Sequence, residues 1–211
     1  MRNRRICMSL LGVVISALSV GAFKASAMGV DPFQSFMSGM NQLIPIAFGT
    51  LYVFVNAVLL LFSLIADRHN IGIATFLNLF FFGYVAEFAQ NQLLTWFGEP
   101  TVLFRLLYLT VGMVGLCFGS SLYMTADLGV STYDALANTL AYKWKVARFQ
   151  YCRIGCDVVC VIAGIGVFFA GGGAPKDVFT FVGIGTILTA FCMGPLIEFF
   201  RVKAALPMLN R

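Results

Sequence analysis

Charged side chains are scarce in this sequence: only 11% of its 211 residues are Asp, Glu, Lys or Arg, and histidine occurs once, at His69. The motifs that hold nucleotide phosphates, a catalytic zinc ion or a nucleophilic serine are absent, namely the Walker loop, His-x-x-x-His and Gly-x-Ser-x-Gly. We therefore expect no enzyme of the soluble type, no cofactor and no metal. The net charge of +5 does not indicate nucleic acid as a partner, because Lys and Arg lie in short clusters between apolar runs.

Apolar residues, in contrast, make up 60% of the chain, and the mean hydropathy is +0.89. Both values lie far outside the average for soluble globular domains. The chain is long enough for six membrane spans of ~20 residues with short connections. The composition thus predicts an all-α integral membrane protein whose main partner is the lipid bilayer.

The apolar runs form two groups of three. The first run, up to residue 23, follows a basic N-terminus and precedes Ala25-Ser26-Ala27, a pattern that also fits a secretory signal peptide. We favour a retained span, because a similar run recurs in the middle of the chain. The other spans are predicted at 45–66, 71–90, 103–126, 149–170 and 178–200. The predicted organisation is one membrane domain, with a first repeat at 1–90, a linker at 91–102 and a second repeat with a cytoplasmic tail at 103–211.

Two segments of similar sequence mark equivalent points of these groups: Gly-Val-Asp-Pro-Phe begins at Gly29, and Gly-Val-Ser-Thr-Tyr begins at Gly129. Asp31 before a proline is a good helix N-cap, and Ser131 with Asp134 resembles a capping box. Each segment therefore predicts a broken span followed by a short half-helix.

Other positions repeat as well. The offset between the two Gly-Val segments also pairs Gly12 with Gly112. The third spans match without gaps, since 71–88 and 182–199 both contain Gly-x-x-Thr and end in Gly-x-x-x-Glu-Phe. The two halves of the chain are therefore predicted to be copies of one three-span unit.

The distribution of Lys and Arg predicts the orientation. Basic residues gather before the first span, at Arg68, at 143–148 and after residue 200, which places both termini in the cytoplasm. Because each copy has an odd number of spans, the second copy then enters the membrane from the opposite side. Inverted repeats related by a pseudo-two-fold axis in the membrane plane are typical of secondary transporters.

The paired Gly-Val segments and the Gly-x-x-Thr…Gly-x-x-x-Glu spans resemble the YczE/YitT-like family of bacterial multi-pass membrane proteins over almost the whole chain. The resemblance implies a location in the bacterial inner membrane and names no substrate. One departure is Gln34, which stands where the second half has Asp134. This departure argues against a symmetric role for the carboxylate.

Ionisable residues inside spans are the sharpest functional candidates, because each costs about 3 kcal/mol to insert. Asp157 lies near the middle of the fifth predicted span, and the polar Asn56 lies near the equivalent position of the second. Asp157 either relays protons or cations in a central cavity or is held by Arg153, one turn earlier on the same helix. Glu87 and Glu198, which recur in the two third spans, either couple ions or lie at the membrane interface.

Two further features have a structural and a functional interpretation. Cys152, Cys156 and Cys160 share one helical face, which could present soft ligands to Cu(I), but close helix packing by small residues is the simpler explanation. The six cysteines indicate no disulfide framework. Lys24 either draws an anion toward the first half-helix or extends to the outer surface.

We expect a small secondary transporter or permease for a small polar metabolite, with a midplane site at the repeat interface. Unwound backbone is tolerated in a membrane only where it lines a cavity or is buried in protein. Helix N-termini attract anions, although Asp31 and Asp134 already place carboxylates there, so a cationic or zwitterionic substrate is also open. The predicted substrate-binding residues are Gly29, Val30, Asp31, Gly129, Val130, Ser131, Asp134, Asn56 and Asp157, and the candidates for ion or proton coupling are Asp157, Glu87 and Glu198.

The alternative is a non-transporting membrane scaffold or regulatory protein that binds a partner through its basic cytoplasmic surface. In that case the half-helices lie flat at the membrane interface, with the apolar stripe of Phe33, Phe36, Met37 and Met40 on lipid. A homodimer is compatible with either function.

Overall fold

The computed structural model describes residues 2–98 and 100–210, without the side chains of residues 2, 69, 149, 150 and 210. Within these residues all regular elements are helices, and six segments are long and apolar enough to cross a membrane. The all-helical class and the six candidate spans are thus confirmed.

The first half consists of α1 (Arg2–Ser26), α2 (Pro32–Leu43), α3 (Phe48–Ala66), the 3-10 turn η1 (Arg68–Asn70), α4 (Ile73–Leu77), the π-helical turn η2 (Asn78–Phe82) and α5 (Gly83–Phe97). The second half consists of α6 (Val102–Ala126), α7 (Thr132–Asn138), the π-helical turn η3 (Thr139–Lys143), α8 (Phe149–Ala170), the 3-10 turn η4 (Pro175–Asp177), α9 (Val178–Phe181), α10 (Ile184–Phe200), the π-helical turn η5 (Arg201–Ala205) and α11 (Leu206–Asn210).

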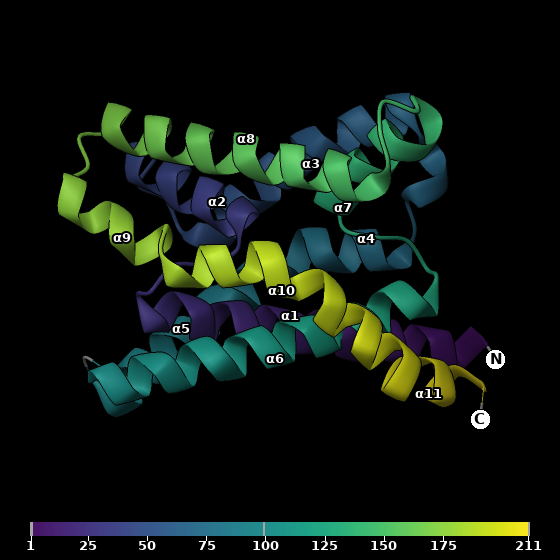
Figure 1. Cartoon of the computed structure of the whole chain (residues 1–211), viewed down its shortest axis with the longest axis horizontal. Coiled ribbons are helices and arrows are strands. Elements are labelled where there is room, and N and C mark those ends of the chain that lie inside the picture. Colours follow the sequence, from purple (N-terminus) through teal and green to yellow (C-terminus); the bar gives the residue numbers. More distant parts are fainter. Residues whose placement is uncertain (1, 99, 211) are drawn as a thin grey trace.

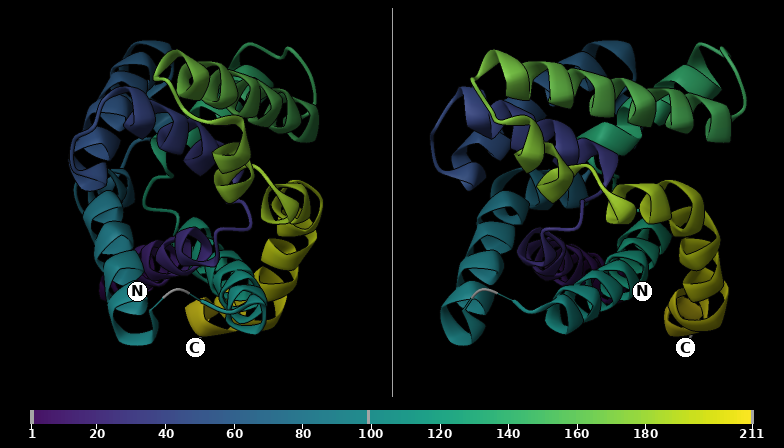
Figure 2. Two further views of the ribbon diagram at one scale, coloured as in Figure 1. Left: turned by 90° about the vertical axis from the view of Figure 1, so that its left-hand side faces the viewer. Right: turned by 60° about the vertical axis from the view of Figure 1, so that its left-hand side comes forward.

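The long helices run along one common axis, and both chain termini lie at the same end of it (Figure 1). One layer contains α3, α8 and the half-helices α2 and α7, and a second layer contains α1 and α6. Figure 2 shows the two layers joined on one flank by α4 and α5 and on the other by α10. Both half-helices begin near the middle of the molecule and lead toward opposite ends, and α2 ends where its Leu43 lies against Gly171 at the end of α8.

The two first spans, α1 and α6, pack along each other. Small residues permit a close approach: a Cβ atom on Gly12 would lie 2.6 Å from the carbonyl oxygen of Gly119, and one on Gly112 would lie 2.9 Å from that of Ser19. The equivalent glycines therefore make equivalent contacts. Since α1 is the most buried of the six candidate spans, its removal would open the core.

The breaks before α2 and α7 have the same backbone conformation. The φ angles are 50° at Ala27 and 54° at Asp127, and they are 97° at Gly29 and 100° at Gly129. An L side chain is strained at the last two values, which explains the glycines. Each half of the chain therefore contains the predicted break and half-helix.

The first break is hydrogen-bonded to the third span of the second half. Val30 donates its backbone N–H to the carbonyl oxygen of Phe181 at 3.1 Å, and Gly185 donates to that of Met28 at 2.9 Å. The approach is so close that a Cβ atom on Gly29 would lie 2.6 Å from the nitrogen of Gly183. These bonds satisfy backbone groups that an apolar environment would otherwise leave unpaired.

The second break makes the corresponding bonds to the third span of the first half. Val130 donates to Asn70 at 3.0 Å, and Ala74 donates to Leu128 at 3.0 Å. A Cβ atom on Gly129 would lie 2.4 Å from the nitrogen of Gly72. The two halves thus exchange the same contacts, each half closing the break of the other.

These contacts explain the repeated Gly-x-x-Thr motif. The backbone N–H of Gly72 donates to Oγ1 of Thr75 at 3.1 Å, and that of Gly183 donates to Oγ1 of Thr186 at 3.2 Å. The glycine leaves room for the break of the other half, and the threonine holds the glycine at the start of the helix. The recurrence of this motif is structural.

The structure adds detail to the predicted organisation in three places. Helix α5 continues to Phe97, so most of the linker predicted at 91–102 is helical. The sixth span begins and ends at the predicted residues, Val178 and Phe200, and is interrupted between α9 and α10, at the Gly183 contact with the first break. The predicted tail is helical through α11, with Ala205 fully buried. Local composition does not reveal such details, because it does not show which polar segments find packing partners.

Candidate functional site

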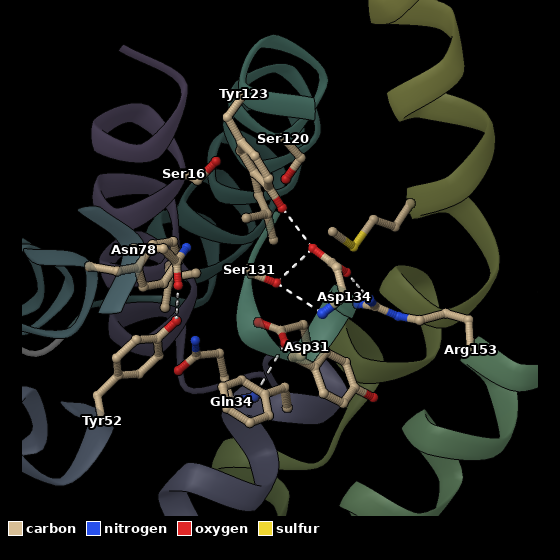
Figure 3. Close-up of a pocket in the computed structure, with 16 residues that line it drawn as sticks. Ser16, Asp31, Gln34, Tyr52, Asn78, Ser120, Tyr123, Ser131, Asp134 and Arg153 are labelled. Atoms are coloured by element: carbon tan, nitrogen blue, oxygen red, sulfur yellow. Dashed lines mark hydrogen bonds and ion pairs between the residues drawn. The ribbon is translucent and has the colours of Figure 1, made fainter. Parts of the chain in front are cut away.

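A cavity of about 60 Å³ lies where the two half-helices begin. Figure 3 shows that its side chains come from both halves of the chain. The polar residues that line it are Ser16, Asp31, Gln34, Tyr52, Asn78, Ser120, Tyr123, Ser131, Tyr133, Asp134 and Arg153. We call this space the central cavity.

The start of α2 contributes Asp31 and Gln34 to the central cavity. Asp31 has extended backbone angles and caps the helix, because its Oδ1 accepts the backbone N–H of Gln34 at 3.2 Å. Pro32 follows at the first helical position, as the sequence predicts. The side chain of Gln34 is almost fully buried, at 3% exposure. This half-helix therefore presents a carboxylate and an amide to the cavity.

The start of α7 contributes Ser131 and Asp134. The hydroxyl of Ser131 accepts the backbone N–H of Asp134 at 3.1 Å and donates to Oδ2 of Asp134 at 2.7 Å. The hydroxyl of Tyr123 donates to the same Oδ2 at 2.8 Å. Oδ1 of Asp134 accepts a charged hydrogen bond from Arg153. The buried Asp134 is thus bonded at both of its carboxylate oxygens.

Arg153 links this carboxylate to Asp157. Its Nε lies 3.4 Å from Oδ1 of Asp157, one turn later in α8, and its guanidinium carbon lies 4.4 Å from the centre of the Tyr133 ring. The hydroxyl of Tyr133 donates to Oδ1 of Asp157 at 2.5 Å. The ring of Tyr133 stacks on Phe33, with centroids 4.9 Å apart, so the two half-helices touch beside the charges. The predicted partner of Asp157 is therefore present, and Arg153 bridges two carboxylates.

The structure places Asn56 next to this cluster and outside the lining of the cavity. Its Oδ1 accepts a hydrogen bond from the hydroxyl of Thr132, the first residue of α7, and its Nδ2 donates to the backbone of Tyr52 at 2.8 Å. Only 1% of Asn56 is exposed. Asn56 therefore positions the second half-helix against α3.

The paired glycines and valines are not among the residues that line the central cavity. Gly29 and Gly129 contact backbone of the third spans, as described above. Val30 is 1% exposed and lines a different cavity, and Val130 accepts a hydrogen bond from Thr75. Of the predicted substrate-binding residues, the structure gathers Asp31, Ser131 and Asp134 around the cavity and places Asp157 one contact away.

The repeated glutamates have different surroundings. Glu87 accepts the backbone N–H of Gly49 at 2.9 Å, in the first turn of α3. Glu198 is exposed and pairs with Arg201 at 2.9 Å. The sequence repeat therefore does not extend to the chemistry of these two side chains.

Two larger cavities, each of about 450 Å³, lie outside the central one. The first lies at the ends of α1 and α9, and its lining includes Lys24, Arg105 and Asp177. The Nζ atom of Lys24 lies 3.1 Å from the centre of the Phe48 ring. Lys24 thus covers an aromatic ring beside a cavity. The second, between α8 and α10, shares Asp134 and Arg153 with the central cavity.

Sequence reasoning missed several residues of the central cavity. Ser16, Tyr52 and Asn78 lie in apolar spans, and Tyr52 donates its hydroxyl to Asn78 at 2.9 Å. The sequence feature that could have revealed these residues is a polar side chain within an otherwise apolar helix. The sequence indicates Arg153 only as a partner of Asp157, because its bond to Asp134 joins two different helices.

Comparison with known proteins places the chain in a family. A family described as "Family of unknown function (DUF6198)" matches residues 3–202. The chain is 26% identical to the uncharacterized membrane protein YczE of Bacillus subtilis over 94% of this chain and 86% of that protein. It is 24% identical to an uncharacterized protein of Haemophilus influenzae, over 97% and 87% of the two chains. No solved structure matches the chain. The resemblance to YczE-like proteins is confirmed, and the chain is a membrane protein that belongs to the DUF6198 family.

Proposed function

We propose that this protein is a small secondary transporter or permease for a small polar metabolite, with the central cavity as its substrate site. The observation that carries the proposal is the cluster of the buried Asp134 with the half-buried Asp31, Asp157 and Arg153 where two half-helices begin. Charged side chains inside a membrane are costly and usually mark the pathway of an ion or a polar solute. Discontinuous helices that meet at a polar cavity are the common way in which transporters build such a site.

We propose further that the two copies are inverted relative to each other around this cavity. Both termini lie at one end of the molecule, the half-helices lead toward opposite ends, and each break bonds to the third span of the other copy. Inverted copies give a transporter two related conformations that open toward opposite sides. The shared lining of the central cavity and the cavity between α8 and α10 indicates where one opening would form.

The charges favour a cationic or zwitterionic substrate over an anion. An anion at the starts of α2 and α7 would meet Asp31 and Asp134, which already bind the backbone or the hydroxyl groups there. Arg153 is the matching cation, and it contacts two carboxylates. We therefore expect an amine on the substrate.

Membrane orientation gives a first test. Reporter fusions after Arg68 and Lys145 should report the cytoplasm, and a fusion after Pro100 should report the outside. An outside signal at Lys145 would contradict the inverted arrangement, whatever the substrate is.

Ligand binding gives the second test. The purified protein is screened for thermal stabilisation by metabolites grouped by charge, since a ligand that binds only the folded state raises its stability. Compounds that stabilise the protein are then tested for uptake into proteoliposomes. We expect hits among amines and amino acids, and we expect Asp134→Asn to lose them. The control is Asp127→Asn, which changes an exposed carboxylate away from the cavity.

The alternative proposal is a scaffold or regulatory protein. It is favoured by the exposed segment from Tyr142 to Arg148, where Trp144 is 53% exposed beside two lysines. The half-helices do not favour it, because Phe33 and Met37 lie in the core and Phe36 and Met40 pack against it. Capture of a partner that depends on Trp144, together with no uptake of any stabilising compound, would support the scaffold.

A further inference from the structure

The cavity between α8 and α10 supplies the space that the central cavity lacks. Its volume is about 450 Å³, whereas the central cavity measures about 60 Å³ and has room for a head group only. Pockets for small organic ligands measure roughly 300–1,000 Å³. The two spaces share Asp134 and Arg153, so they meet at the charged cluster. A ligand with its head group at the starts of the half-helices therefore extends into the larger cavity.

This larger cavity opens to the outside of the helix bundle. Helix α8 lies along α2 and helix α10 lies along α6, and both pack against these partners more than against each other. Ile154 of α8 and Phe191 of α10 line the cavity, and they are 53% and 77% exposed. Exposed apolar side chains on a membrane span contact lipid. The cavity therefore opens toward the bilayer.

Most of the side chains around the cavity are apolar. They include Met124, Ile154, Phe191, Met193, Pro195 and Ile197. An apolar group that moves from water into such a lining gains stability in proportion to the area that it buries. The shape and the lining thus suit a ligand with an apolar body.

The charged residues that the cavity reaches carry an excess of negative charge. Asp134 and Asp157 line it together with Arg153, which pairs with both. Asp31, at the start of α2, also interacts electrostatically with Arg153 and with Asp157. Three carboxyl groups thus share one guanidinium group. A ligand that brings a second positive charge is attracted here, and an anionic ligand is repelled.

Helix α10 adds a backbone acceptor. Pro195 lies inside this helix and has no N–H, so the carbonyl oxygen of Phe191 lacks its usual donor one turn later. Both residues line the cavity. An ammonium group donates up to three hydrogen bonds and accepts none, which matches carboxylate and carbonyl oxygens.

We propose that the cavity between α8 and α10 binds an amphipathic amine from the bilayer, with its ammonium group beside Asp157 and its apolar body between the two helices. The inference rests on the proposed function for the positive charge of the substrate, and it adds the apolar body and the lateral route. Arg153 stays bonded to Asp134, and the side chain of Asp157 is 15% exposed, so a ligand reaches Asp157 without displacing the arginine.

The test uses the purified full chain in detergent and the primary alkylamines from ethylamine to hexylamine. For each amine, the concentration at half-maximal thermal stabilisation is measured. We expect this concentration to fall roughly fourfold for each added methylene, because each one leaves water for an apolar lining. Hexanol and hexanoate have an apolar body of similar size and no ammonium group, so neither should stabilise the protein in a saturable way.

Two variants separate the head group from the body. Asp157→Asn should weaken all the amines roughly tenfold or more, and Asp127→Asn should not, because Asp127 is exposed and lies outside the cavity lining. Gly194→Leu adds a side chain to the lining at a position where a Cβ atom meets nothing within 4 Å. It should weaken hexylamine far more than ethylamine. Gly155→Leu is its matched control, since that position is equally open and lies outside the lining.

The proposal is overturned if affinity does not rise with chain length, if hexanol or hexanoate stabilises the protein as hexylamine does, or if both variants bind hexylamine like the wild type. If Asp157→Asn does not fold, the Gly194→Leu comparison decides alone. Binding in detergent that is absent in phosphatidylcholine nanodiscs also overturns the proposal, because lipid then fills the cavity.

Failure of the transporter is recognised separately, by uptake into proteoliposomes. Hexylamine binding that meets every criterion above, without uptake of any amine, contradicts transport and supports the binding site. Uptake of ethylamine together with no effect of chain length on binding supports transport and contradicts the amphipathic site.

Discussion

The two half-helices have the same backbone and different chemistry. Their breaks agree to within a few degrees in φ, and each is closed by a Gly-x-x-Thr segment of the other half. Yet the first presents Asp31 without an ion pair in the described chain, and the second presents Asp134 bound to Arg153. The comparison teaches that the two copies share the backbone arrangement, which we call the frame. The side chains that differ between the copies lie at the candidate site.

The largest effect should come from Arg153, the cation that pairs with the carboxylate of the second half-helix. Arg153→Met leaves the buried Asp134 and the half-buried Asp157 without a cation, and stranding a buried charge typically costs about 3–5 kcal/mol. We expect a loss of that order in the free energy of unfolding, measured by denaturant titration in detergent. Arg201→Met is the matched control, because Arg201 and Glu198 are both about half exposed and such pairs contribute roughly 0–1 kcal/mol.

A double variant sharpens this comparison. Adding Asp134→Asn to Arg153→Met removes one of the two stranded carboxylates, so part of the lost stability should return. If the double variant is less stable than Arg153→Met alone, the bridge is not the main role of the arginine.

The second effect concerns Gly29 and Gly129, the glycines that the breaks before the two half-helices share. Gly29→Ala and Gly129→Ala force a side chain into positive φ and into backbone contact at 2.6 and 2.4 Å, so each should cost about 1–3 kcal/mol. Thermal unfolding measures both costs. Because the two glycines contact different partners, Gly183 and Gly72, the costs should add to within about 0.5 kcal/mol.

Gly155→Ala provides the control for these glycines. Its Cβ atom would meet nothing within 4 Å, and alanine is a better helix former than glycine. Stability should therefore stay the same or rise. Equal losses at Gly29 and Gly155 would show that the break geometry is not what requires glycine.

The frame could largely be predicted from the sequence. Apolar runs predict spans because only helices satisfy the backbone inside lipid, and the fifth span was predicted with the bounds of α8. The caps at Asp31 and Ser131 were predicted because a cap is a local interaction, and both accept the expected backbone N–H. The two Gly-Val breaks were predicted because they interrupt apolar runs at equivalent points.

The chemistry of the site could be predicted only in part. Asp31, Ser131 and Asp134 belong to local motifs, so the sequence indicated them. Ser16 and Gln34 are distant in the chain from the second half-helix, and nothing in their local sequence shows that they share its cavity. The glycines were predicted at the substrate site because a broken span usually lines a cavity, whereas here the other half of the chain covers them.

A third, smaller effect separates the two threonines of the repeated motif. Oγ1 of Thr75 donates to the carbonyl of Val130 at 2.7 Å and thereby links the two halves. Oγ1 of Thr186 donates to Phe181 at 3.2 Å, but that carbonyl also accepts from Val30 and from Ser35. Thr75→Val should thus cost about 1 kcal/mol in thermal unfolding, and Thr186→Val should cost less. Thr75→Ser should recover most of the loss, and equal costs for the two valine variants would contradict the difference.

The smallest effect concerns the two glutamates, which the sequence repeats most faithfully. Glu198→Gln removes one member of an exposed pair, so its stability should change by less than about 0.5 kcal/mol. Glu87→Gln keeps an acceptor for the N–H of Gly49 and removes the charge near the start of α3, which is worth about 0.3–1 kcal/mol. A structural role therefore predicts a small loss at Glu87, none at Glu198 and unchanged ligand stabilisation in both variants. A coupling role shared by the two copies predicts the reverse, since both variants would then keep their stability and lose the response to ligand together. Measuring both responses on the same two proteins decides whether this last repeated pair belongs to the frame or to the site.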